Sequence, residues 1–327
     1  MTRATVWRID VADVYLVTGG AGFIGSHVVT ELLERGHVVR VLDNFSTGRR
    51  GNLAASDGDV EVFEGDVRSY ERAHNAVKGC DYVIHLAALP SVPRSVQDPL
   101  TTSAVNVTGT LNTLLAARDA AVRRVVLASS SSVYGANETM PKHEGVAPEP
   151  ISPYAVSKLA AEQYARAFWA VYGLETVSLR YFNVFGPRQD PSSQYSGVVP
   201  RFMRLALEGG DPVVFGDGLQ SRDFTYVANV VDATLSAATV DEAAGSICNI
   251  GCGAPKTVLD LIAAISRVSA RRISPQFAPP RLGDVKHSFA DITVARRVLG
   301  YEPRIDFDTG IALTFRSVAA EIGGGPA

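Results

Sequence analysis

The sequence has no strong surplus of charge of either sign, and it contains little cysteine. Its 327 residues include 31 Lys and Arg against 34 Asp and Glu, which gives a formal net charge of −3. So small an imbalance argues against electrostatic binding of a nucleic acid. The three cysteines, Cys80, Cys248 and Cys252, are too few for a disulfide framework. We therefore expect free thiols, no metal site, and the reducing cytoplasm as the location.

Long hydrophobic runs are also missing. No apolar stretch approaches the roughly 20 residues that a membrane-spanning helix needs, and residues 1–13 lack the apolar core of a secretory signal. We therefore expect no membrane partner. Hydrophobic residues nevertheless make up 46% of a chain that is longer than one ordinary domain core requires. These two features predict a globular protein with two lobes.

Strands and helices alternate through the first half of the chain, which predicts an α/β fold with a Rossmann-like, doubly wound parallel sheet. The expected strands are Val14–Thr18, Val38–Asp43, Val60–Glu64, Tyr82–Leu86 and Arg124–Ser130. The expected helices are Phe23–Arg35, Leu100–Ala120, Val227–Ala238, Val258–Val268 and Ile292–Leu299, with a long loop at 183–198. The regularity weakens after about residue 181. We therefore expect a nucleotide-binding domain at 1–181, completed by later segments, and a smaller mixed α/β lobe at 182–327.

A glycine-rich turn follows the first expected strand. Gly19, Gly22 and Gly25 are spaced three residues apart, and Phe23 and Ile24 begin the next helix. Glycines let the backbone approach a pyrophosphate, and the N–H groups of the helix then point at that anion. The spacing is one residue wider than the common dinucleotide fingerprint, and a purely structural turn is the alternative. Its place between a strand and a helix favours a dinucleotide site.

Asp43 ends the second expected strand, eighteen residues after Gly25. A carboxylate there would accept hydrogen bonds from the adenosine ribose and repel a 2′-phosphate, which favours NAD over NADP. Arg49 and Arg50 lie farther along and leave NADP open, and a turn cap made with Asn44 is the structural alternative. Asp66 and Val67, after the third strand, are expected beside the adenine.

A phenol, an ammonium and a hydroxyl form the second group of chemically informative residues. Tyr154 and Lys158 follow a Ser-Pro pair typical of a helix start, and side chains at i and i+4 share one helical face. A free tyrosine titrates near ~10. Lys158 and a positively charged nicotinamide would favour the phenolate, so that Tyr154 would serve as a base. Ser130 ends a strand and could relay a proton. An exposed helix pair and a polar strand cap are the alternatives.

In combination, these motifs resemble the extended short-chain dehydrogenase/reductase superfamily and, within it, the UDP-hexose 4-epimerases, over nearly the whole chain. The resemblance implies that Tyr154 is the catalytic base, that Lys158 holds the cofactor ribose and that Ser130 is the catalytic hydroxyl. Further cofactor contacts that it implies are Asn44, Ala87, Ala88, Asn106, Ser129 and Tyr181.

The resemblance also implies a nucleotide-diphosphate site in the second lobe. Asn183 is expected beside the nicotinamide and the diphosphate, and Val199 in the segment that reads uracil. Arg222, Arg281 and Asp284 are expected at the diphosphate and ribose, because arginine gives charge-assisted bonds to phosphate oxygens. For each arginine, a solvated surface position is the alternative.

The sugar is expected to lie against Pro90, Ser91, Arg94, Ser131 and Arg188. Ser288 stands where some relatives carry a bulky residue, which would leave room for a large sugar. Arg94 or Arg188 could pair with a C6 carboxylate. We therefore expect UDP-glucuronate first, followed by UDP-N-acetylglucosamine or UDP-glucose.

Other reactions occur on similar scaffolds. Dehydratases carry an Asp-Glu pair after the catalytic hydroxyl, and decarboxylases carry Glu at the second place, whereas this chain has Ser131 and Ser132. Serines are poor proton donors, which favours epimerisation. A reductase and a non-catalytic NAD-binding regulator stay open. Helices near Leu100–Ala120 and Pro153–Val171 resemble the pair that forms the dimer in this family, which predicts a homodimer.

Overall fold

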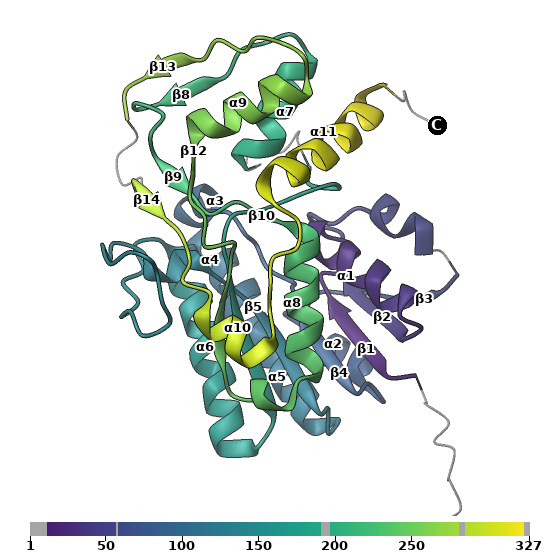
Figure 1. Ribbon diagram of the computed structural model, residues 1–327. Coiled ribbons are helices and arrows are strands. Elements are labelled where there is room, and N and C mark those ends of the chain that lie inside the picture. Colours follow the sequence, from purple (N-terminus) through teal and green to yellow (C-terminus); the bar gives the residue numbers. More distant parts are fainter. Residues whose placement is uncertain (1–11, 57, 191–196, 281–284, 324–327) are drawn as a thin grey trace, which may run out of the picture.

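The computed structural model describes residues 12–56, 58–190, 197–280 and 285–323. A layered α/β unit forms the larger part, and a smaller lobe sits above one edge of its sheet (Figure 1). The expected fold class is confirmed, and the expected helix and strand positions agree closely with the observed bounds.

One parallel sheet of seven strands, in the order β11-β6-β5-β4-β1-β2-β3, organises the larger part. Its strands are β1 (Val14–Thr18), β2 (Val38–Asp43), β3 (Val60–Glu64), β4 (Tyr82–His85), β5 (Arg124–Ser130), β6 (Glu175–Tyr181) and β11 (Ile247–Ile250). The central strand β4 is buried at every residue, as expected for a parallel strand covered on both faces. The strand order reverses between β1 and β4, and this reversal opens a crevice at the carboxyl edge.

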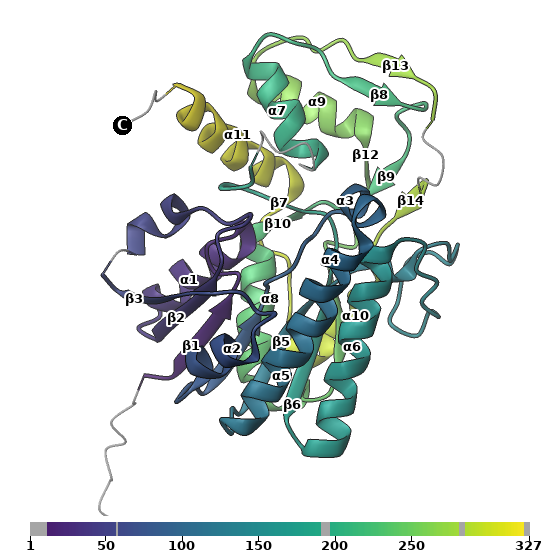
Figure 2. The same cartoon turned by 180° about the vertical axis from the view of Figure 1, so that it is seen from behind.

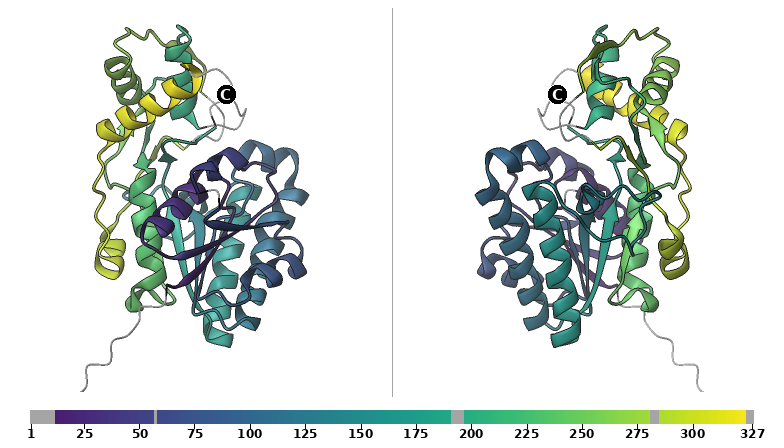
Figure 3. Two further views of the ribbon diagram at one scale, coloured as in Figure 1. Left: turned by 90° about the vertical axis from the view of Figure 1, so that its right-hand side faces the viewer. Right: turned by 90° about the vertical axis from the view of Figure 1, so that its left-hand side faces the viewer.

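Helices cover both faces of this sheet (Figures 2 and 3). One face carries α1 (Phe23–Glu34), α8 (Val227–Thr239) and α10 (Thr293–Leu299), and the other carries α2 (Tyr70–Val77), α5 (Gly109–Asp119) and α6 (Pro153–Tyr172). The short helices α3 (Val92–Gln97) and α4 (Pro99–Ser103) precede α5. The expected helix 100–120 is therefore α4 and α5, joined by a π-helical turn at Ala104–Thr108.

The smaller lobe is mixed α/β. Its helices are α7 (Val198–Leu207), α9 (Val258–Val268) and α11 (Phe307–Gly323). Its short strands are β7 (Val184–Phe185), β8 (Val213–Phe215), β9 (Ser221–Arg222), β10 (Thr225–Tyr226), β12 (Lys256–Thr257), β13 (Gln276–Ala278) and β14 (His287–Ser288). Because α8, α10 and β11 return to the large sheet, the chain crosses between the two parts several times. These crossings fix the lobe above the carboxyl edge of the sheet.

Three further features of the described residues concern membrane-spanning helices, metal-binding clusters and free cysteines. Over the described ranges, no helix has both the length and the apolar character to cross a bilayer. Within the same ranges, no three His, Cys, Asp or Glu side chains gather closely enough to hold a metal ion. Cys80 and Cys248 are buried free thiols, and Cys252 is a partly buried one.

Candidate active site

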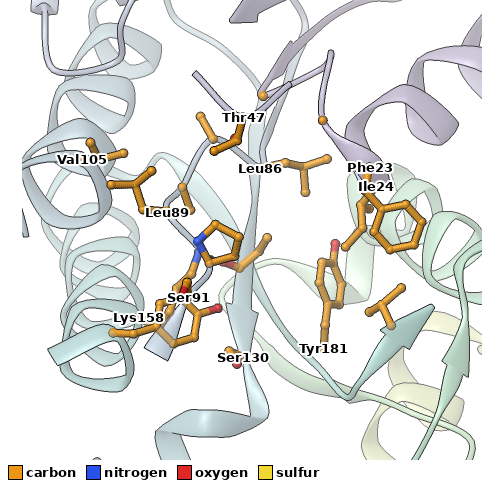
Figure 4. A pocket seen from close by; sticks show the side chains of 18 of the residues that line it. Phe23, Ile24, Thr47, Leu86, Leu89, Ser91, Val105, Ser130, Lys158 and Tyr181 are labelled. Atoms are coloured by element: carbon orange, nitrogen blue, oxygen red, sulfur yellow. The ribbon is translucent and has the colours of Figure 1, made fainter. Parts of the chain in front are cut away.

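A cavity of about 1560 Å³ lies between the carboxyl edge of the large sheet and the smaller lobe. Figure 4 shows Lys158 on one side of it, Tyr181, Phe23 and Ile24 on the other, and Ser130 between the two sides. The cavity brings together most of the residues expected from the sequence. They are Gly19, Gly22, Phe23, Ile24, Gly25, Asp43, Asn44, Asp66, Val67, Ala87, Ala88, Pro90, Ser91, Arg94, Ser129, Ser130, Ser131, Tyr154, Lys158, Tyr181, Asn183 and Arg222.

The glycine turn between β1 and α1 leaves no room for side chains. A Cβ at Gly25 would lie 2.1 Å from the carbonyl oxygen of Gly19. Gly19 itself has a φ of +72°, and its Cβ would lie 2.7 Å from the backbone nitrogen of Ala87. The turn is therefore compact, and the first N–H groups of α1 face the cavity. This cradle fits the pyrophosphate of a dinucleotide.

Asp43, at the end of β2, is fixed by backbone groups on both sides. Its Oδ2 accepts a hydrogen bond from the N–H of Ala21 at 3.0 Å, and its Oδ1 accepts one from Phe45 at 2.8 Å. Burial raises the pKa of Asp43, and these backbone hydrogen bonds oppose the rise. Each carboxylate oxygen keeps a further lone pair, so a ribose hydroxyl can still donate to it.

The two arginines after β2 are paired with acidic residues. Arg49 Nη2 lies 2.6 Å from Asp190 Oδ1. Arg50 forms an ion pair with Glu64, and its guanidinium lies 4.1 Å from the centre of the Phe45 ring. Both ion pairs are solvent-exposed, so the preference for NAD rests on Asp43 rather than on these arginines.

Asp66 lies beyond the end of β3 at the same side of the cavity. It accepts hydrogen bonds from Asn44 Nδ2 at 2.7 Å and from the guanidinium of Arg68 at 3.0 and 2.8 Å. These bonds, of which those from Arg68 are the strongest, lower the pKa of Asp66. The carboxylate is therefore ionised and held in place where the adenine is expected.

Helix α6 presents the phenol and the ammonium. Ser152 caps the helix by accepting a hydrogen bond from the N–H of Ala155, and Pro153 occupies the first turn. Tyr154 and Lys158 then fall on the buried face of the helix, one turn apart. Lys158 Nζ donates to the carbonyl oxygen of Ala128 in β5 at 2.8 Å. Helix α6 thus places both side chains at the cavity, and strand β5 holds the lysine there.

Ser130 completes this group. Burial raises the pKa of Tyr154, and a side-chain hydrogen bond with Ser130 opposes the rise. Burial lowers the pKa of Lys158 to about 8, against a smaller, opposite effect of Glu162. The expected lowering of the Tyr154 pKa by Lys158 is not found in the chain alone, where burial dominates and Ser130 gives the opposing effect. Ionisation of Tyr154 consequently depends on further positive charge in the cavity.

Some expected site residues lie elsewhere. Asn106, in the π-helical turn, is buried behind the cavity, where its side chain bonds the backbone N–H of Leu89 at 2.8 Å. Val199 is packed in the core at the start of α7. Ser288 pairs with Arg222 between β14 and β9 but does not line the cavity. Arg281 and Asp284 lie outside the described residues.

The position of Arg188 departs from the expectation of a sugar contact. Its Nη1 donates to the Ser26 carbonyl oxygen at 3.0 Å and to Thr30 Oγ1 at 3.2 Å, both on α1. His27 of the same helix bonds the carbonyl oxygen of Pro187 at 2.9 Å. Arg188 does not line the cavity. It ties the start of the smaller lobe to α1, and we therefore assign it no contact with the sugar.

Several cavity residues were not expected from the sequence. They are Phe45–Gly48 after β2, Lys142 in the loop before α6, and Gln189 and Asp190 after β7. Arg49 and Ser132, which the sequence raised only in weighing alternatives, also line it. Lys142 is almost fully buried and bonds the carbonyl oxygen of Asn137. Within the described part of the chain, Ser132 Oγ has no hydrogen-bond partner. These residues come from irregular loops without periodicity.

A doubly wound sheet with a glycine turn and a Ser–Tyr–Lys group at its carboxyl edge defines the extended short-chain dehydrogenases/reductases. Comparison with known proteins narrows this class. The NAD dependent epimerase/dehydratase family matches residues 15–251. The chain belongs to this family, and its cofactor is NAD.

Individual relatives agree with this assignment. The UDP-glucose 4-epimerase of Mycolicibacterium smegmatis is 41% identical over 91% of this chain and 96% of its own. The structure of the UDP-N-acetylglucosamine 4-epimerase from Methanobrevibacter ruminantium, in complex with UDP-N-acetylmuramic acid, matches with a TM-score of 0.91 at 38% identity, over 95% of this chain and 99% of its own. MoeE5 in complex with UDP-glucuronic acid and NAD matches with a TM-score of 0.85 at 36% identity, over 95% and 100%. The resemblance to UDP-hexose 4-epimerases is confirmed.

Proposed function

We propose that this enzyme inverts C4 of a UDP-linked sugar through a 4-keto intermediate. The observation that carries the proposal is the meeting of Tyr154, Ser130 and Lys158 in the cavity that the glycine turn also lines. Bound NAD supplies a hydride acceptor that is regenerated in each cycle. The chain supplies the proton chemistry and the grip on the substrate.

Each of the three side chains has a defined task. Tyr154 accepts the proton of the C4 hydroxyl and later returns one to the C4 oxygen. Ser130, which lines the cavity together with Tyr154, bonds the same sugar oxygen and passes the proton. Lys158 is held by Ala128 and orients the cofactor ribose. Arg222 lines the cavity on the side of the smaller lobe, where it grips the diphosphate while the sugar turns over.

The decisive experiment replaces Tyr154 by Phe. Removal of one hydroxyl should lower kcat at least about 10²-fold, the lower range for a lost general acid–base group, and leave the bound NAD content unchanged. Turnover at the wild-type rate would overturn the proposed mechanism. A reductase would show net consumption of NADH when UDP-sugar is added, whereas an epimerase forms the isomer without it.

For the sugar, we propose UDP-glucuronate as the preferred substrate. Besides Arg49, Lys158 and Arg222, two further cationic side chains, Arg94 and Lys142, line the cavity. A C6 carboxylate is the substituent that these two would favour. MoeE5 has been solved with UDP-glucuronic acid and also with UDP-glucose, so the choice between these sugars rests on the two cationic side chains. Since Arg188 is bonded to α1, Arg94 is the arginine that we assign to the carboxylate.

UDP-glucose is the second candidate, because the Mycolicibacterium relative is named a UDP-glucose 4-epimerase. UDP-N-acetylglucosamine is the third. A panel of the three UDP-sugars with chromatographic separation of the C4 epimers ranks them. Arg94→Ala should reduce kcat/KM for UDP-glucuronate by about tenfold or more, the effect of a lost charge-assisted bond of ~1.5–3 kcal/mol, and leave UDP-glucose nearly unchanged. Equal losses on both sugars would contradict the carboxylate assignment.

We also propose that the enzyme is a cytoplasmic homodimer, divided into a nucleotide-binding part at 1–181, completed by α8, α10 and β11, and a substrate lobe at 182–327. The outer face of α6 supports the dimer. Val156, Tyr164 and Val171 repeat along it and are 53%, 38% and 70% exposed, which is the pattern of an apolar stripe that a partner covers. Light scattering of Val171→Asp should show a monomer where the wild type shows a dimer.

A further inference from the structure

Helix α6 buries one more charged residue that the proposed chemistry does not use. Glu162 lies four residues after Lys158 and therefore on the same helical face, one turn farther from the cavity. Its side chain is 0% exposed, and that of Arg180, its ion-pair partner on β6, is 3% exposed. An ionised carboxylate so completely removed from water calls for a physical reason.

The hydrogen bonds of Glu162 connect α6 to the two strands behind the catalytic group. Arg180 donates from Nε to Oε1 at 2.9 Å and from Nη2 to Oε2 at 2.8 Å, in a two-pronged pair. Ser129 donates its hydroxyl to the same Oε1. Ser129 and Arg180 are neighbours across β5 and β6, and Ser129 directly precedes Ser130. The carboxylate thus holds the strand end that carries the catalytic hydroxyl.

The far side of the pair reaches the edge of the sheet. The guanidinium carbon of Arg180 lies 4.7 Å from the centre of the Tyr134 ring. The Tyr134 hydroxyl in turn donates to Asn249 Oδ1 in β11 at 2.7 Å. Helix α6, three strands of the sheet and the turn after β5 therefore share one buried polar network.

Stability alone does not explain this network, because replacing a buried ion pair by apolar residues is often neutral or stabilising. The effect of Glu162 on Lys158 gives another explanation of the network, because Lys158 has few other charged neighbours. Glu162 on its own helix is the only acidic side chain with a marked effect on it among the described residues. His85 on β4 is neutral at physiological pH because burial lowers its pKa to about 3. Tyr154 shares the helical face, and Arg180 reaches the site only through Glu162.

We propose that Glu162 is a positioning residue for the catalytic group. Its carboxylate fixes the end of β5, and with it Ser130, and its negative charge keeps Lys158 protonated one helical turn away. This inference rests on the proposed function, since it assigns Glu162 a role through Ser130 and Lys158. It predicts an effect of Glu162 on the pH dependence of the enzyme as well as on its rate.

The test replaces Glu162 by Gln in the NAD-loaded enzyme and measures kcat/KM against pH with UDP-glucuronate and UDP-glucose. Loss of the negative charge lowers the proton affinity of Lys158. This moves the profile toward acid, by about one pH unit for a charge at this spacing. We expect kcat to fall more than tenfold, with KM for the UDP-sugar within twofold of the wild-type value.

The chain offers a matched control. Glu175 pairs with Arg124 on the same two strands at their opposite end, with Arg124 Nη2 2.6 Å from Glu175 Oε2. Glu175→Gln also breaks a Glu–Arg pair of the sheet, and it should leave the pH profile in place. We expect the control to give a curve of kcat/KM against pH that differs from the wild type only by a constant factor. If Glu162→Gln gives the same result, Glu162 is merely structural and the proposal is wrong.

A second variant covers the case in which Glu162→Gln folds poorly. The double variant Glu162→Gln, Arg180→Gln replaces the ion pair by a neutral amide pair and should regain the melting temperature without regaining the wild-type pH profile. Regain of both would overturn the proposal.

A readout that needs no turnover separates this inference from the proposed function. The chain has only five lysines, so NMR of 13Cε-labelled lysine can follow Lys158 directly, with its signal assigned from Lys158→Met. We expect the midpoint for Lys158 to fall by about one unit in Glu162→Gln. An unchanged midpoint refutes the inference, whereas full activity of Tyr154→Phe refutes the proposed function and leaves this measurement intact.

Discussion

The buried ammonium of Lys158 gives a prediction that links stability to function. Lys158 is 7% exposed, and burial lowers its pKa from 10.5 to about 8. We expect Lys158→Met to make the folded NAD-free protein more stable at pH 7 and to abolish epimerase activity. The reason is that methionine fills much of the same volume with apolar atoms and has no charge to desolvate.

The magnitude follows from the pKa difference. A shift of 2.5 units (10.5 − 8), at 1.36 kcal/mol per unit, corresponds to about 3 kcal/mol of destabilisation by the charged lysine. The variant also loses the hydrogen bond from Nζ to Ala128, which offsets about 1 kcal/mol. The net gain is about 2 kcal/mol, or a melting temperature about 3 °C higher for a chain of this length.

The dependence on pH gives this prediction its sharpest form. Below pH 8 the lysine is protonated in both the folded and the unfolded chain, and the full destabilisation is present. Between about pH 8 and 10.5 the folded chain has lost the proton and the unfolded chain still holds it, so wild-type stability rises with pH. Thermal unfolding of both proteins at pH 7 and pH 10 should show the gap closing. A variant that is less stable than the wild type by the same amount at both pH values would refute the reasoning.

Three further predictions concern the glycine turn, the ribose carboxylate and the link to α1. Gly25→Ala should yield protein without NAD, measured by the absorbance of the released cofactor, because its Cβ would lie 2.1 Å from the Gly19 carbonyl oxygen; a normal NAD content would contradict the turn geometry. Asp43→Asn should weaken NAD binding about tenfold in calorimetry and narrow the preference over NADP, since a charged acceptor is lost; unchanged selectivity would remove Asp43 from the ribose site. Arg188→Ala should lower the melting temperature and change kcat/KM for UDP-glucuronate and UDP-glucose by the same factor, in contrast to Arg94→Ala; a loss confined to UDP-glucuronate would return Arg188 to the sugar.

The regular part of the fold was predictable because its periodicity and turn chemistry agree. Strands β1, β2, β3 and β5 begin and end at the expected residues, since each is a short apolar run bounded by glycine or polar residues. The π-helical turn at Ala104–Thr108 was not predictable. It adds a residue to one helical turn without any change in apolar pattern, and it directs Asn106 to Leu89 behind the cavity.

The candidate site was predictable where all the residues of one contact come from a single short motif. The glycine turn and the pair Tyr154 and Lys158 are examples. The site was not predictable where two distant loops meet. Arg188 stands in a polar loop that allows either a sugar contact or a bond to α1, and only the folded chain shows that Ser26 and Thr30 accept its hydrogen bonds. Lys142 gives no signal at all in the sequence, because a lone lysine in a loop is usually solvated.

The serines after β5 explain why this cavity suits epimerisation better than elimination or decarboxylation. Epimerisation moves a single proton out and back at the C4 oxygen, so one base, Tyr154, serves both directions. Elimination of water needs a second acid–base pair within reach of the neighbouring carbons, and the places that would hold it are Ser131 and Ser132. Within the described residues Ser132 Oγ is buried without a hydrogen-bond partner, and the acidic residues that line the cavity, Asp43, Asp66 and Asp190, lie at or beyond the ends of other strands than β5. A hydroxyl in such surroundings can bond a sugar oxygen but cannot hold a proton in transit near neutral pH. Elimination of water therefore lacks its acid–base pair here, which favours return of the hydride to C4.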